Sequence, residues 1–67
     1  MNDEALKAAI GRFLKYIDAT AQREIEMAIR NAVARGKLRG NETCTAAVTL
    51  SSEKIGLDVT IYSKIEL

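Results

Sequence analysis

The densest group of positively charged side chains in the sequence lies near its middle and comprises Arg30, Arg35, Lys37 and Arg39. No acidic residue lies between Glu26 and Glu42. Clustered cations bind phosphate when they converge on one surface. They also stabilise the carboxyl end of a helix, where the backbone carbonyls carry partial negative charge. We favour the second interpretation, because the segment ARGKLRG contains helix-ending glycines and charged runs usually lie in solvent.

The other reactive side chains do not form a catalytic set. Cys44 is the only cysteine and the chain has no histidine, so we interpret Cys44 as a small apolar residue of a strand. Ser51 and Ser52 have no neighbouring base and are expected in a turn. Glu24 and Glu26 would point about 200° apart on a helix, too far for a close acid–base pair. We therefore expect no enzymatic activity, cofactor, metal site or small-molecule substrate.

The apolar spacing of the first half of the chain predicts two helices. Asn2 or Asp3 is expected to cap the first helix, whose stripe comprises Leu6, Ala9, Ile10, Phe13, Leu14 and Ile17. The segment Asp18-Ala19-Thr20 interrupts this pattern, and Thr20 is a favourable N-cap for a second helix. The stripe of that second helix comprises Ala21, Ile25, Ala28, Ile29, Ala32 and Val33. Gly36 is expected to end it in the left-handed conformation.

After Gly40 the apolar period changes to two, which predicts two strands. The apolar phase of the first strand comprises Cys44, Ala46, Val48 and Leu50, and that of the second comprises Ile55, Leu57, Val59 and Ile61. Residues 51–54, with Gly56 nearby, are expected to form the turn. The sequence thus predicts a single α+β domain over residues 1–67, with both helices packed on one face of an antiparallel hairpin.

Length and composition indicate how such a fold is stabilised. The chain has 67 residues, is 48% hydrophobic and has a net charge of +1. So short a chain builds only a small core, and a two-stranded sheet leaves both edges open. We therefore expect a homodimer whose strands extend the sheet across a two-fold axis. The start of the chain is unlike a signal peptide and no apolar run reaches membrane-spanning length, so a cytoplasmic protein without membrane contact is expected.

The segment TAQREIEMAIRNAVARGKLRGNE, preceded by RFLK, resembles a domain family of unknown function. That family consists of short proteins found mainly in proteobacteria. The residues that match the family's first core segment are Thr20, Gln22, Arg23, Glu24, Ile25 and Glu26. Those that match its second core segment are Gly36, Lys37, Leu38, Gly40, Asn41 and Glu42. The resemblance implies a bacterial source and the same element order, and it implies no activity.

Two functions remain open from the sequence. The leading one is a non-catalytic module that binds itself or another protein, with a contact patch formed by Arg23, Met27, Arg30, Asn31 and Ala34. The alternative is a minimal winged-helix-like nucleic-acid-binding protein that uses Thr20, Gln22, Arg23, Arg30, Arg35, Lys37 and Arg39. Glu24 and Glu26 would repel phosphates in that mode. The two functions differ in whether the cations converge on one open surface.

Overall fold

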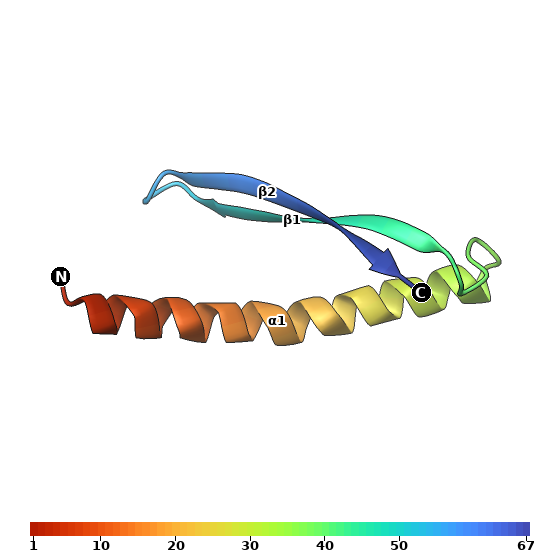
Figure 1. Cartoon of the computed structure of the whole chain (residues 1–67), viewed down its shortest axis with the longest axis horizontal. Coiled ribbons are helices and arrows are strands. Elements are labelled where there is room, and N and C mark those ends of the chain that lie inside the picture. The colour runs from red at the N-terminus through yellow and green to blue at the C-terminus, as the bar shows by residue number, and fades with distance from the viewer. The chain divides into compact units, whose positions relative to one another are not determined.

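A computed structural model describes all residues, 1–67, and contains three elements. Helix α1 spans Asp3–Ala34, strand β1 spans Thr43–Ser52 and strand β2 spans Leu57–Glu66 (Figure 1). The α+β class predicted from the sequence is confirmed. The chain divides into two units, Met1–Lys37 and Leu38–Leu67, which are described in turn.

Helix α1 begins at an asparagine cap. Asn2 has extended backbone angles, φ −83° and ψ 122°, and its Oδ1 accepts hydrogen bonds from the amides of Glu4, at 2.8 Å, and Ala5, at 3.3 Å. The first amides of a helix have no partner within the helix, so this side chain satisfies two of them. Asp3 and Glu4 place negative charge in the first turn, where the helix dipole is positive.

The prediction of two helices is wrong, because α1 continues through residues 18–20 without a break. Ile17, Ala21 and Ile25 follow one another at steps of four residues, so the apolar stripe keeps its phase across residues 18–20. Asp18 accepts a hydrogen bond from the Nε2 atom of Gln22 at 3.4 Å, one turn later. Thr20 lies inside α1 and caps nothing.

Helix α1 ends at the glycine expected from the sequence. Arg35 is the C-cap, and Gly36 follows with a φ of 77°. The amide of Gly36 bonds to the carbonyl of Val33 at 3.0 Å, and the amide of Lys37 bonds to that of Ala32 at 2.9 Å. This pair of bonds is the Schellman arrangement, which needs a left-handed residue at the position of Gly36.

The second unit is an antiparallel hairpin in which Thr43 pairs with Glu66 and Ser52 with Leu57. Strand pairing puts the apolar side chains of both strands on one face, namely Cys44, Ala46, Val48, Leu50, Leu57, Val59, Ile61 and Ile65. The opposite face is polar, and on it the hydroxyls of Thr49 and Thr60 lie 3.1 Å apart. The alternation predicted for the strands is therefore confirmed.

The turn of the hairpin lies slightly later than predicted. Ser51 and Ser52 are the last residues of β1, and residues 53–56 form the turn. Gly56 has a φ of 66°, and its amide bonds to the carbonyl of Glu53 at 3.2 Å. Ile55 is consequently a turn residue, 73% exposed, and does not belong to the apolar phase of β2.

No residue of the chain is buried. On α1 the side chain of Phe13 is 56% exposed, and on the hairpin that of Ile61 is 54% exposed. A helix alone and a two-stranded sheet alone cannot surround a side chain, so neither unit has a core of its own. The expected single domain, with helix packed on hairpin, stays a prediction.

Candidate interaction surfaces

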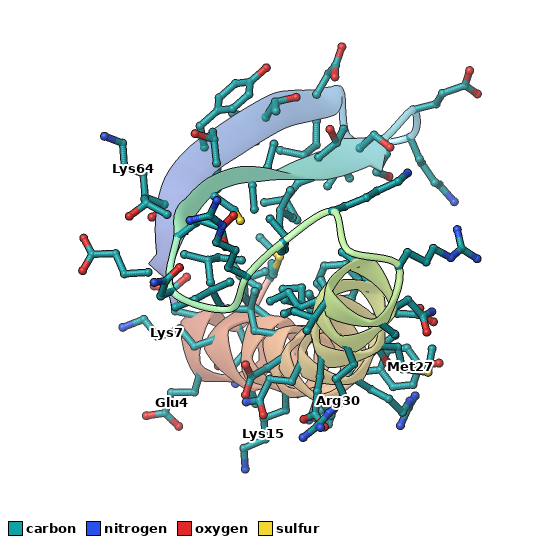
Figure 2. All side chains as sticks on the ribbon, turned by 90° about the vertical axis from the view of Figure 1, so that its right-hand side faces the viewer. Glu4, Lys7, Lys15, Met27, Arg30 and Lys64 are labelled. Atoms are coloured by element: carbon teal, nitrogen blue, oxygen red, sulfur yellow. The ribbon has the colours of Figure 1, made fainter.

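The contact patch predicted on the helix lies on one side of α1. Its residues, which we call the Met27 patch, follow one another at steps of three and four: Arg23, Met27, Arg30, Asn31 and Ala34. At about 100° per residue they span an arc of about 100°. Met27 is 50% exposed, and Figure 2 shows Met27 and Arg30 projecting outward on neighbouring sides of the helix. The structure therefore brings this set of residues together.

One cation of the Met27 patch is already paired. The Nε atom of Arg30 donates to Oε2 of Glu26 at 2.9 Å, and both side chains are exposed. An exposed pair at this helical spacing contributes only about 0.3–0.5 kcal/mol to stability. The pair nevertheless offsets the charge that Arg30 would present to a phosphate, and it leaves Arg23 as the unpaired cation of the patch.

The four central cations are spread over different parts of the chain. Arg30 lies within α1, Arg35 is its C-cap, Lys37 follows the helix, and Arg39 belongs to the second unit. Arg30 and Arg35 are five positions apart, so they point about 140° apart around the helix axis. The last turn of α1 contains no basic residue, so Arg30 lies earlier in the helix than predicted, whereas Arg35, the C-cap, lies at the carboxyl end as predicted.

A carboxylate organises the loop that leads into the hairpin. Oε1 of Glu42 accepts hydrogen bonds from the backbone amides of Arg39, at 2.7 Å, and Gly40, at 3.0 Å. Gly40 has a φ of 98°, which only glycine adopts at little cost. Sequence reasoning did not assign Glu42 a role in this loop, because the side chains that usually mark a turn are Asn, Asp, Ser and Thr.

The geometry proposed for nucleic-acid recognition is absent. A helix-turn-helix needs a turn before the recognition helix, and α1 is continuous from Asp3 to Ala34. Thr20 and Arg23 therefore do not open a helix and present no free amides to a phosphate. Gln22 lies about 100° away from Arg23 around α1 and is bonded to Asp18.

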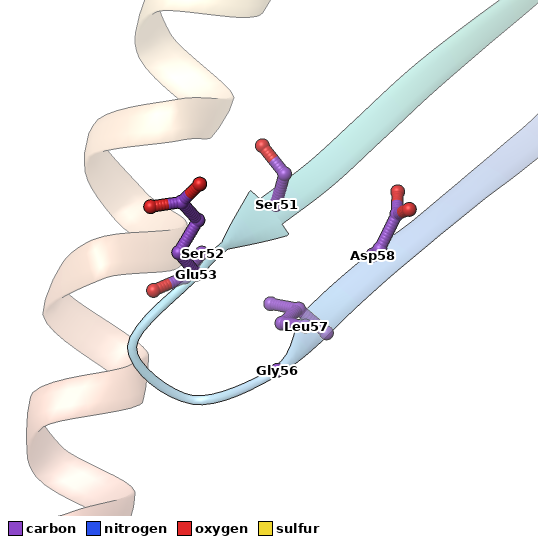
Figure 3. A pocket seen from close by; sticks show the side chains of 6 residues that line it. All are labelled: Ser51, Ser52, Glu53, Gly56, Leu57 and Asp58. Carbon is purple, nitrogen blue, oxygen red and sulfur yellow. The ribbon is translucent and has the colours of Figure 1, made fainter.

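A shallow, open hollow lies at the turn of the hairpin (Figure 3). It is lined by Ser51, Ser52, Glu53, Gly56, Leu57 and Asp58. Ser51 lies directly opposite Asp58 in the strand register, and no hydrogen bond joins any two of these side chains. The hollow thus has neither a histidine nor an activated hydroxyl from which a nucleophile could be built.

Cys44 is half-buried on the apolar face of the hairpin and opposite Ile65, in the strand phase predicted for it. No group of three or more histidine, cysteine, aspartate or glutamate residues is placed to hold a metal ion. Helix α1 has the length to cross a bilayer, but no helix combines that length with enough apolar residues to do so.

Sequence reasoning also missed a difference between the two strands. Strand β1 contains neither a charged residue nor proline over its ten residues. Strand β2 carries Asp58, Lys64 and Glu66. The signal was visible in the sequence as the run TCTAAVTLSS, but it gains meaning only once the strand bounds are known.

Comparison with known proteins places the chain in a family and goes no further. The family whose sequence model matches is described as a family of unknown function (DUF6494), and the match covers residues 1–67. No curated protein and no solved structure matches the chain.

Proposed function

Because the chain belongs to the DUF6494 family, a family of unknown function, we propose its function from its own surfaces. We propose that it is a small, non-catalytic interaction module of the bacterial cytoplasm that assembles as a homodimer. Its role in this proposal is to bind protein, and the dimer is the form that does so.

The observation that carries this proposal is the complete absence of buried residues. A net charge of +1 and a hydrophobic fraction of 48% are typical of a folded protein, not of a disordered chain. Such a chain needs a core to offset the entropy of ordering its backbone. Large apolar side chains are open to solvent on both units, among them Phe13 and Ile61. A second copy supplies the apolar surface that one chain lacks.

Strand and helix lengths support the same conclusion. Ten-residue strands extend about 33 Å, whereas the 32-residue helix α1 is about 48 Å long. Even if the hairpin of one chain covered as much of its own helix as possible, about 9 Å of the apolar stripe, which runs from Leu6 to Val33 over about 42 Å, would remain open. Covering that remainder requires a surface from another molecule.

The Met27 patch is the surface that we propose for a partner protein. It combines an exposed methionine with arginine, and both residue types are enriched at the centres of protein interfaces. The flexible thioether of Met27 adapts to the shape of a partner at little cost. The apolar faces would serve the dimer, and the Met27 patch would remain available on each copy.

The proposal is tested by the mass of the protein in solution. We expect light scattering after size exclusion to give twice the 7.3 kDa of one chain at micromolar concentrations. We also expect the midpoint of thermal unfolding to rise with protein concentration, because association stabilises the folded state by mass action. A mass of one chain up to about 100 μM, with a midpoint independent of concentration, would refute the proposal.

A further inference from the structure

A hydrogen bond at the open end of the hairpin shows which residues of β1 bond to β2 and which turn their backbone groups outward. The amide of Leu67 bonds to the carbonyl of Glu42 at 2.9 Å, and these two residues continue by one position the register that pairs Thr43 with Glu66. Directly opposite residues that share a bond recur at every second position of an antiparallel pair. The even-numbered residues of β1 therefore bond to β2. The odd-numbered residues turn their amides and carbonyls outward, and these are Thr43, Thr45, Ala47, Thr49 and Ser51.

The outer edge of β1 lacks every device that normally prevents a strand from pairing with another chain. Natural edges carry charged residues, proline or bulges. Strand β1 has no charge and no proline, and its pairing with β2 runs without a bulge over all ten residues. Strand β2 differs, because its outward-turned groups include those of Asp58, Lys64 and Glu66. Of the two edges, that of β1 is the one suited to accept a strand.

We propose that β1 pairs antiparallel with β1 of a second copy, across a two-fold axis at Ala47, to form a four-stranded sheet with the order β2-β1-β1-β2. This inference rests on the proposed homodimer and specifies its interface. Ala47 would face Ala47 of the other copy, Thr45 would face Thr49, and Thr43 would face Ser51. All five outward-turned residues then exchange backbone hydrogen bonds with the partner.

The side chains favour this register. On the apolar face, Ala46 would lie beside Val48 of the other copy and Cys44 beside Leu50, so the apolar surface runs on across the interface. On the polar face, threonine meets threonine or serine, a favourable cross-strand combination. Ala47, one of the two alanines in the middle of the strand, lies on the axis, where each side chain meets its own copy. A shift of the axis by one residue would leave Thr43 or Ser51 without its partner.

Pairing through β2 would be less favourable. Full overlap of β2 with its own copy centres on Tyr62 and places Asp58 opposite Glu66 twice. Like charges directly opposite one another destabilise a strand pair. The charge pattern therefore selects β1 for a full-length pairing.

Cysteine cross-linking tests the register directly. In a Cys44→Ala background, Ala47→Cys places two thiols on residues whose Cα atoms lie about 5.5 Å apart, within the range of a disulfide. We expect mild oxidation to convert this variant to a covalent dimer on a non-reducing gel. The matched control is Thr45→Cys, whose two copies would lie about 14 Å apart and should not cross-link. A mixture of Thr45→Cys with Thr49→Cys should cross-link, since those two residues face each other.

Each outcome decides a separate point. Failure of Ala47→Cys to cross-link, in a variant whose mass in solution is that of a dimer, overturns the inference but leaves the proposed homodimer intact. Cross-linking by Ala46→Cys or Val48→Cys in place of Ala47→Cys overturns the register. A monomeric parent protein overturns both proposals.

A charge exchange provides a test without thiols, in case Ala47→Cys does not fold. Ala47→Lys and Ala47→Glu each place like charges against one another on the axis, and each should weaken self-association about two- to fivefold. An equimolar mixture of the two variants should associate as tightly as the parent or more tightly. Thr60→Lys and Thr60→Glu, on the same face of β2, are the controls. They should show neither the weakened self-association nor its recovery in a mixture. Failure of the mixture to recover association overturns the inference.

Discussion

The continuity of α1 can be tested by the sign of a single substitution, Thr20→Ala. If Thr20 capped a second helix, its loss would destabilise the protein by about 1 kcal/mol. Inside a continuous helix, alanine is favoured over threonine by about 0.5 kcal/mol. Thr20 is half-buried, so loss of its methyl group offsets part of that gain. We therefore expect a change in the free energy of unfolding between zero and about 0.5 kcal/mol in the stabilising direction.

Asn2→Ala is the matched control, because Asn2 is the cap that the structure contains. Its Oδ1 accepts two amide hydrogen bonds, at 2.8 and 3.3 Å, and alanine leaves both amides to water. We expect a loss of about 1 kcal/mol. The two substitutions should thus differ in sign although both replace a small polar residue by alanine.

Urea unfolding followed by far-ultraviolet circular dichroism measures both effects, at one fixed protein concentration because the proposed association would contribute to stability. With a slope of about 1 kcal/mol per molar urea, Asn2→Ala should lower the midpoint by about 1 M. Thr20→Ala should leave it unchanged or raise it by up to about 0.5 M. A fall of about 1 M for Thr20→Ala, matching that of Asn2→Ala, would refute the continuous helix.

Three further substitutions probe the glycines and the loop. Gly36→Ala should lower the free energy of unfolding by about 1–2 kcal/mol, because a left-handed φ of 77° strains any other residue. Gly11→Ala should raise it by about 1 kcal/mol, because Gly11 lies inside α1 with open space where a Cβ would lie. Urea unfolding measures both changes, and equal signs would contradict the helix bounds. Glu42→Ala should accelerate amide hydrogen exchange at Arg39 and Gly40, which lose their acceptor; unchanged exchange would show that the carboxylate does not hold the loop.

Much of the fold could be predicted from local signals. Asn2, Gly36 and Gly40 mark boundaries through backbone chemistry that depends on a few neighbouring residues. The strand alternation likewise follows from a period of two, which the register confirms. These features needed no knowledge of distant contacts.

The continuity of α1 was not predicted, because residues 18–20 resemble a helix boundary in composition alone. Neither glycine nor proline is present there, and the stripe passes in phase from Ile17 to Ala21. Phase is therefore the better guide than composition, since a helix tolerates polar residues such as Asp18 on its exposed side. The polar side chains Asp18 and Gln22 bond to each other along that side.

The candidate surfaces could be predicted only in part. The Met27 patch follows from helical spacing, which holds whether the chain forms one helix or two from Thr20 onward. The spread of the central cations follows from the glycine that ends α1, which was expected, whereas the pairing of Arg30 with Glu26 was not predicted. The outer edge of β1 required the register, which fixes the groups that face outward.

The difference in charge between the outer edges of β1 and β2 bears on how large an assembly this chain could form. A hairpin with two permissive edges would add copies without limit and polymerise into a fibril. Here the side that carries Asp58, Lys64 and Glu66 would terminate growth once two copies have joined. If β1 pairs as proposed, neutralising those three positions should turn a dimer into an open-ended filament, because the charged residues of β2 would no longer prevent further copies from adding.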